Sequence, residues 1–89
     1  MRDTTVTTTE TASFDIELSK GDARVQWFKD DIEIQFSHHI QLLINGKKQK
    51  LLIVNCTQED EGDYKCVVGK EKSVGRLTVI EGRRDDLRF

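Results

Sequence analysis

The chain has 89 residues, of which 36% are hydrophobic and 34% are charged, and its formal net charge is −2. This length accommodates one domain with one hydrophobic core, and the composition suits a globular chain rather than a disordered or membrane-embedded one. No apolar run approaches the roughly 20 residues of a membrane helix, and binding to phosphates needs a basic excess on one face. We therefore expect neither a membrane nor a nucleic acid as a partner.

Apolar and polar residues alternate with a period of two along most of the chain, which indicates β-strands with one buried face. The predicted strands cover residues 12–18, 25–27, 32–34, 40–44, 51–56, 64–68 and 77–79. Lys20-Gly21-Asp22 is predicted to form a turn, and Asn45-Gly46 a hairpin, because Asn and Gly both tolerate positive φ. Short strands at this spacing, with no helical period between them, indicate an antiparallel sandwich or a small barrel.

A tryptophan and a tyrosine motif favour the sandwich. Trp27 lies on the second predicted strand, and Asp60, Gly62, Tyr64 and Cys66 fit the pattern Asp-x-Gly-x-Tyr-x-Cys. In a tyrosine corner, a tyrosine two residues before a cysteine bonds back to upstream backbone. Gly62 would free the turn sterically, and Asp60 could cap its amides. A tyrosine on a strand is more often only a core residue, but the complete pattern favours the corner.

At these residues the sequence resembles the intermediate (I-set) immunoglobulin domains, especially those of the intracellular titin, obscurin and myosin-binding protein C group. The resembling segments, named by that family's strand letters, are residues 3–6 (A′), 10–14 (B), 25–30 (C), 45–51 (D–E hairpin), 51–57 (E) and 75–79 (G). The resemblance covers residues 3–80 and implies an all-β, immunoglobulin-like two-sheet antiparallel β-sandwich. It implies one domain at residues 1–82 and a polar tail or linker at residues 83–89, and strand A is expected to be missing.

The resemblance also bears on the two cysteines. Ile16 stands where strand B of the family normally carries a cysteine, so we expect no B–F disulfide and a Cys66 that packs as a small hydrophobe. Cys56 belongs to strand E in the other sheet, where its Cβ is not expected to converge with that of Cys66. A core without this bond suits a reducing compartment, which predicts a cytoplasmic location. Asn55-Cys56-Thr57 fits the N-glycosylation rule and would favour a secreted protein instead, although so short a triplet arises easily by chance.

The fold separates predicted core residues from predicted partner surfaces. The core residues that hold the two sheets together are predicted to be Phe14, Ile16, Trp27, Leu51, Ile53, Tyr64 and Cys66. Alternation sends Phe28 and Val67 to the outer face of the C–F–G sheet, where they could form an apolar patch. The edge at Val6–Thr9, or the strand after Lys70, could accept a partner strand. The alternative is that these are ordinary exposed residues.

Charged residues cluster in turns at opposite ends of the expected sandwich. Lys47 and Lys48 in the D–E turn, with Lys70 and Lys72 in the F–G turn, form a basic end where the chain enters. The acidic E–F turn at residues 59–63 lies at the end where the chain leaves. In a string of similar domains this layout would bias how one domain aligns on the next, unless the two clusters are simply solvated loops.

No sequence pattern indicates an enzyme, since a nucleophile elbow, a phosphate-binding glycine loop and a Cys/His pairing are all missing. His38 and His39 are adjacent on an extended segment, so at least one must point away from the other, and we expect no metal and no cofactor. The resemblance implies a non-catalytic structural and protein-binding module of a large multidomain muscle sarcomere or cytoskeletal protein. Its implied partners are neighbouring immunoglobulin or fibronectin domains and filament proteins such as myosin, actin or titin-like chains. The alternatives are an extracellular adhesion or receptor ectodomain of the same fold, and a module that regulates an attached kinase.

Overall fold

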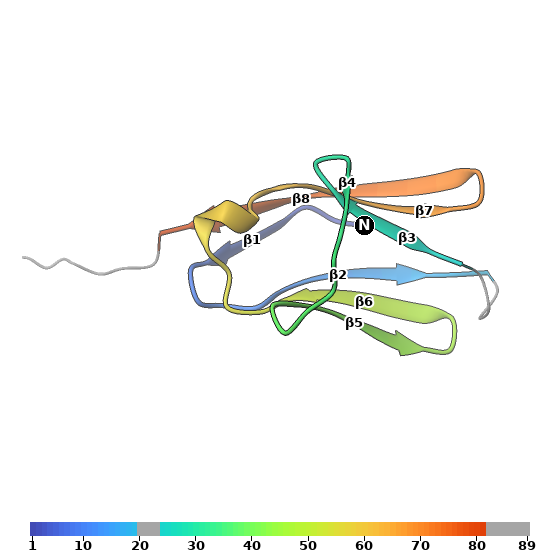
Figure 1. The fold of residues 1–89 in the computed structure, drawn as a ribbon, viewed down its shortest axis with the longest axis horizontal. Helices are drawn as coiled ribbons and strands as arrows, with labels where there is room; N and C mark the ends of the chain where they lie inside the picture. The colour runs from blue at the N-terminus through green and yellow to red at the C-terminus, as the bar shows by residue number, and fades with distance from the viewer. Residues whose placement is uncertain (20–23, 82–89) are drawn as a thin grey trace, which may run out of the picture.

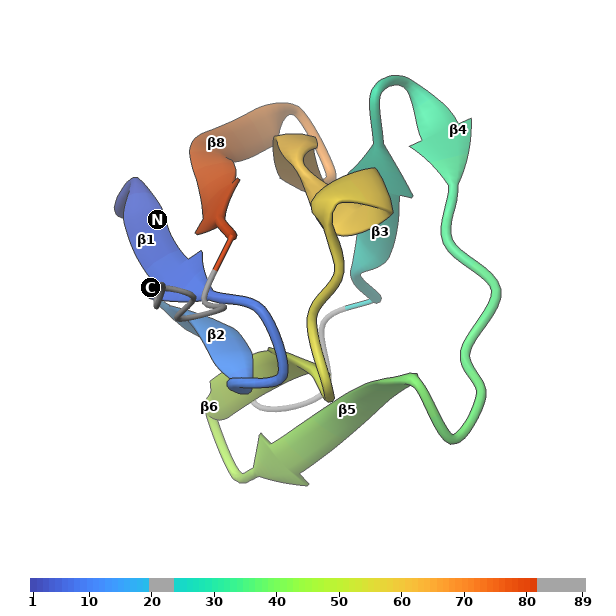
Figure 2. The same cartoon turned by 90° about the vertical axis from the view of Figure 1, so that its left-hand side faces the viewer.

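The computed structural model describes residues 1–19 and 24–81, and within them eight strands form two facing sheets (Figures 1 and 2). The predicted turn at residues 20–22 and the predicted tail at residues 83–89 lie outside the described residues. The elements are β1 (Thr4–Thr7), β2 (Ala12–Glu17), β3 (Gln26–Lys29), β4 (Ile32–Glu33), β5 (Ile40–Asn45), β6 (Lys48–Ile53), the 3₁₀ turn η1 (Gln58–Asp60), β7 (Gly62–Val68) and β8 (Glu71–Ile80). This arrangement confirms the predicted two-sheet sandwich.

The two sheets follow the order β1-β8-β7-β3-β4 and β2-β6-β5. All strand pairs are antiparallel except that of β1 with β8, which is parallel and aligns Thr4 with Leu77 and Thr7 with Ile80. The turns after β5 and β7 lie at one end of the sandwich, whereas η1 and the end of β8 lie at the other (Figure 1). In the part of the chain that the structure describes, no helix has the length and apolar character needed to cross a membrane.

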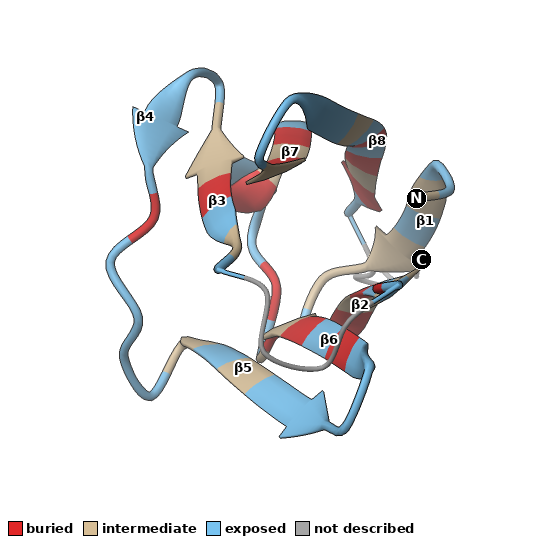
Figure 3. Cartoon of the chain, turned by 90° about the vertical axis from the view of Figure 1, so that its right-hand side faces the viewer, coloured by how far each residue is buried: buried red, intermediate tan, exposed pale blue. Residues whose placement is uncertain are grey.

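The core fills the space between the inner faces of the two sheets (Figure 3). The buried apolar residues that form it are Ala12, Phe14, Trp27, Ile34, Leu51, Ile53, Cys56, Tyr64, Cys66, Leu77 and Val79. Ile16 differs from the other predicted core residues, because it is only partly buried and packs against this cluster without being part of it. Its cross-strand partner on β6 is the amide residue Gln49 rather than an apolar one.

The strand β5 buries less apolar surface than its alternation predicts. Ile40 and Leu42 are partly buried, but Ile44 on the same face is 61% exposed and the adjacent Leu43 is 52% exposed. The reason is the position of β5, which borders the three-stranded sheet and pairs only with β6 among the described strands. Side chains on an edge strand lack neighbours on one side, so a correct alternation does not ensure burial.

Candidate functional site

The motif around Tyr64 links the start of β7 to the η1 turn. Tyr64 is completely buried, and its phenol O–H donates a hydrogen bond to the backbone carbonyl of Asp60 at 2.7 Å. Gly62 has a φ of +153°, and a Cβ at this position would lie 2.6 Å from Oδ2 of Asp30. The space that glycine leaves open lets the Asp30 carboxylate accept a hydrogen bond from the Asp63 N–H at 2.9 Å. The three residues predicted for the corner thus lie together at the joint between turn and strand.

The side chain of Asp60 makes a second set of contacts within the same turn. Its Oδ2 accepts a hydrogen bond from the Thr57 N–H at 2.8 Å, which caps η1. Nε2 of His39 lies 2.9 Å from Oδ1 and 3.0 Å from Oδ2 of the same carboxylate. His39 belongs to the segment that crosses from β4 to β5, so this contact ties the crossing segment to the turn. Nothing in the local sequence pattern pointed to it, because the two residues are 21 positions apart.

Carboxylates also attach β8 to segments beyond the regular ladder. Oε2 of Glu61 accepts a hydrogen bond from the Val79 N–H at 2.9 Å, and Oδ1 of Asp3 accepts one from the Arg76 N–H at 3.0 Å. The Thr8 N–H continues the parallel pairing by donating to the Ile80 carbonyl at 2.9 Å. β1 is therefore joined along its whole length to the last four residues of β8.

The predicted apolar patch lies on the outer face of the five-stranded sheet. Phe28 and Val67 are both partly buried, and they point outward because Trp27 and Cys66, their neighbours in sequence, point into the core. The ammonium group of Lys65 lies 5.2 Å from the centre of the Phe28 ring, at a distance typical of a cation–π contact. The ring is thus partly covered by a charged side chain of the domain itself.

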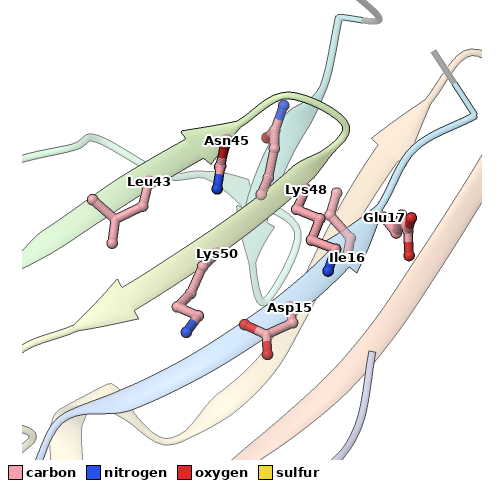
Figure 4. Close-up of a pocket in the computed structure, with 8 residues that line it drawn as sticks. Asp15, Ile16, Glu17, Leu43, Asn45, Lys48 and Lys50 are labelled. Atoms are coloured by element: carbon pink, nitrogen blue, oxygen red, sulfur yellow. The ribbon is translucent and has the colours of Figure 1, made fainter. Parts of the chain in front are cut away.

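The predicted basic turn lies on a different surface. Lys47 and Lys48 are exposed at the β5–β6 hairpin, so the structure does not bring them together with Phe28 and Val67. On the outer face of the three-stranded sheet, Lys48 and Lys50 pair in register with the acidic residues Glu17 and Asp15 of β2. With Leu43 and Asn45 of β5 they border a shallow hollow of about 610 Å³ (Figure 4).

Most of the acidic E–F turn is engaged within the domain. Asp60 is buried and caps η1, Glu61 binds the Val79 N–H, and Asp63 accepts a hydrogen bond from Arg76 at 2.9 Å. Glu59 is exposed, and Asp63 is exposed as well but is paired with Arg76. The acidic end therefore offers less free charge to a neighbouring domain than the sequence indicates.

Both cysteines are free thiols inside the core. Cys56 is 1% exposed and Cys66 is 3% exposed, and burial raises the pKa of each thiol. The Cys56 thiol also donates to the Ile53 carbonyl at 3.3 Å. Within residues 1–19 and 24–81, His, Cys, Asp and Glu side chains form no group that could hold a metal ion. Because thiolate is the reactive form, these two thiols are suited to packing rather than to chemistry at neutral pH.

The corner hydrogen bond yields a testable prediction. Tyr64→Phe is expected to lower the free energy of unfolding at pH 7 by about 1–3 kcal/mol, because the buried Asp60 carbonyl loses its donor. Burial, reinforced by the Asp60 carboxylate, raises the pKa of Tyr64 far above its ordinary value. Stability from this group is therefore present below about pH 10 and is lost as the pH rises further. Urea titrations at pH 7 and pH 11 should show a smaller alkaline loss in the variant, and an equal loss in both proteins would contradict this role.

Comparisons with known proteins agree with this geometry. Residues 1–80 match the family model of the Immunoglobulin I-set domain. Titin of Drosophila melanogaster is 52% identical over 81 residues, or 91% of this chain, and cardiac-type myosin-binding protein C of Rattus norvegicus is 41% identical over 66 residues, or 74% of this chain. The chain spans only a very small part of either relative: 5% of the length of that myosin-binding protein C, and a share of that titin that rounds to 0%. A crystal structure of domain I10 from titin superposes with a TM-score of 0.86 at 34% identity, covering 89% of this chain and 90% of that one.

Proposed function

Because this chain belongs to the immunoglobulin I-set family, we propose that it is a non-catalytic structural module of a large multidomain muscle protein. In this role it spaces neighbouring immunoglobulin or fibronectin domains and binds filament proteins such as myosin, actin or titin-like chains in the cytoplasm. The observation that carries the proposal is the 52% identity to titin across 91% of the chain. The buried free thiols support a reducing compartment, because the core is closed without a disulfide.

The parallel pairing of β1 with β8 supports a mechanical role. Both strands run toward the same end of the sandwich (Figure 1), so tension that separates the two chain ends would pull β1 and β8 in opposite directions along their length. All hydrogen bonds between β1 and β8 would then bear the load at the same time, because the force acts along the strands (shear). A strand pair pulled open from one end would instead lose its bonds one at a time.

Force spectroscopy on a tandem array of this domain tests the mechanical part of the proposal. Val6→Pro removes the N–H that should donate to β8, since donors in the parallel ladder recur every second residue from Thr8. We expect the unfolding force to fall, because the β1–β8 ladder then has one hydrogen bond fewer to bear the load. Gln41→Pro in β5 is the matched control, since it also removes a ladder N–H but lies outside the β1–β8 ladder. Equal losses of force in the two variants would contradict the shear role.

The location and the thiol state of the native protein test the rest of the proposal. A fluorescent tag on the parent protein should give periodic striations in muscle cells. Alkylation of the native protein without reductant should label both Cys56 and Cys66 after denaturation, and Asn55 should carry no glycan. A diffuse or extracellular signal, or a glycan on Asn55, would overturn the proposal.

A further inference from the structure

The two sheets leave four border strands among the described residues: β1 and β4 in one sheet, β2 and β5 in the other. β1 and β4 are short, with four and two residues, and β2 carries Asp15 and Glu17. β5 has six residues, Ile40–Asn45, and includes neither a charged residue nor a proline. Natural proteins usually protect an open sheet edge with charged residues or prolines, or by keeping the edge strand short. β5 is therefore the border strand best able to pair with another strand.

Apolar side chains border this edge on both faces of the sheet. Leu43 is 52% exposed and Ile44 is 61% exposed, and adjacent residues of a strand point to opposite faces. Figure 2 shows β5 at the outer border of its sheet, beside the segment that crosses from β4. A strand added at this border would cover both side chains at once.

Two hydrogen bonds establish which backbone groups of β5 face outward. The Val54 N–H donates to the His39 carbonyl, so His39 and every second residue after it direct their backbone groups toward β6. The Ser37 N–H donates to the Ile40 carbonyl from the opposite side. Ile40, Leu42 and Ile44 consequently direct their N–H and C=O groups away from β6, and Ser37 already occupies the carbonyl of the first. Leu42 and Ile44 remain to bind a new strand.

We propose that β5 pairs antiparallel with β5 of a second copy of this chain, around a two-fold axis at Leu43. In this register Leu43 lies opposite Leu43 of the second copy, and Leu42 lies opposite Ile44. The register follows from three conditions: paired residues must face the same side of the sheet, the occupied Ile40 carbonyl must be avoided, and Leu43 must meet an apolar residue rather than Asn45. Each exposed apolar residue then meets an apolar residue, and the two three-stranded sheets become one sheet of six strands.

A second copy suits this edge because the strand is uncharged and exposes apolar side chains on both faces of the sheet. No ionised side chain of β5 would meet its own copy. The nearest column of charges, Lys48 and Lys50 on β6, would lie three strand spacings from the same column of the second copy, or about 14 Å. Charges at that separation are largely screened at physiological ionic strength. One added strand pair buries less than a standard interface, so we expect a weak dimer with a Kd of about 0.1–1 mM.

Sedimentation equilibrium at low and high protein concentration tests the edge. The wild-type domain should be monomeric near 10 μM and largely dimeric near 2 mM, as that range of Kd implies. Leu43→Lys and Ile44→Lys should weaken association at least tenfold, because each places a charge opposite or beside the same charge of the second copy. Val74→Lys and Ile80→Lys are the matched controls, since these residues are 53% and 52% exposed on the other sheet. A wild-type protein that stays monomeric at 2 mM, or controls that weaken association equally, would overturn the proposal.

Cysteine cross-linking tests the register. Leu43 pairs with its own copy at a position without hydrogen bonds, where the Cα atoms lie about 4.5 Å apart, within the range of a disulfide. Leu43→Cys should therefore form a cross-linked dimer under mild oxidation, whereas Gln41→Cys should not. The wild-type chain is the control for its buried thiols Cys56 and Cys66. Preferential cross-linking of Gln41→Cys, or none for Leu43→Cys in a sample shown to be dimeric, would overturn this register.

Discussion

Phe14→Ala is expected to lower the free energy of unfolding by about 3–5 kcal/mol, a large share of the roughly 5–15 kcal/mol that stabilises a typical domain. Phe14 projects from β2 in one sheet and stacks on Tyr64 from β7 in the other, with ring centres 5.1 Å apart and planes inclined by 28°. Both rings are buried, with exposures of 1% and 0%. In a sandwich without an inter-sheet disulfide, this stack is a direct aromatic contact between the two layers.

Urea denaturation followed by tryptophan fluorescence measures the loss, because Trp27 reports on the same core. Phe14→Leu is the control: it keeps most of the apolar volume and removes the ring, so its loss should be about 1–2 kcal/mol. The alanine variant leaves a cavity beside Tyr64 and Gly75, whose Cα faces the Phe14 ring so closely that a Cβ would lie 3.0 Å from Cε1. A loss below 2 kcal/mol for the alanine variant would show that the sheets are held together elsewhere.

The sequence predicted most reliably what depends on a single strand or turn. Alternation identified the inner faces of β2, β6 and β7, because burial of one face of a strand against the opposite sheet imposes a period of two. The tyrosine motif is equally local, since Tyr64 bonds to a residue only four positions upstream. Alternation failed at Ile44, because the number of neighbouring strands is a property of the sheet and not of the strand.

Contacts between distant segments could not be predicted in the same way. The pairing of His39 with Asp60 and the placement of Lys65 over Phe28 join elements that are adjacent only after the sheets have formed. Such side chains are long and polar, and many partners would satisfy them equally well, so composition and spacing carry no signal for a particular pair. The same reasoning explains why the acidic E–F turn looked like a free charge cluster, although three of its carboxylates bind within the domain.

The absence of the B–F disulfide can be tested at Ile16, because this residue is only partly buried and its replacement by cysteine removes little packing. Ile16→Cys is expected to form a bond with Cys66 under oxidising conditions, because the family resemblance places these residues opposite each other across the core. A bond that closes the loop between residues 16 and 66 adds about 4 kcal/mol to the free energy of unfolding in the chain-entropy model. The loss of partly buried isoleucine packing costs about 1 kcal/mol. We expect the oxidised variant to be more stable than the wild type by about 1–3 kcal/mol, since engineered bonds often deliver less than the model predicts.

Reduction separates the two contributions. With a reductant present, Ile16→Cys should be about 1 kcal/mol less stable than the wild type, because only the lost packing remains. The double variant Ile16→Cys with Cys66→Ser should be insensitive to oxidation. Gln49 is the cross-strand partner of Ile16, and Cys56 lies seven residues further along the chain, past the end of β6, so Cys56 is too far from position 16 to pair with it. Peptide mapping that finds a bond to Cys56, or no bond at all, would show that Ile16 does not occupy the strand position of the usual cysteine. If the bond to Cys66 forms and stabilises the domain, then Ile16 occupies the strand position where the family normally carries its first cysteine.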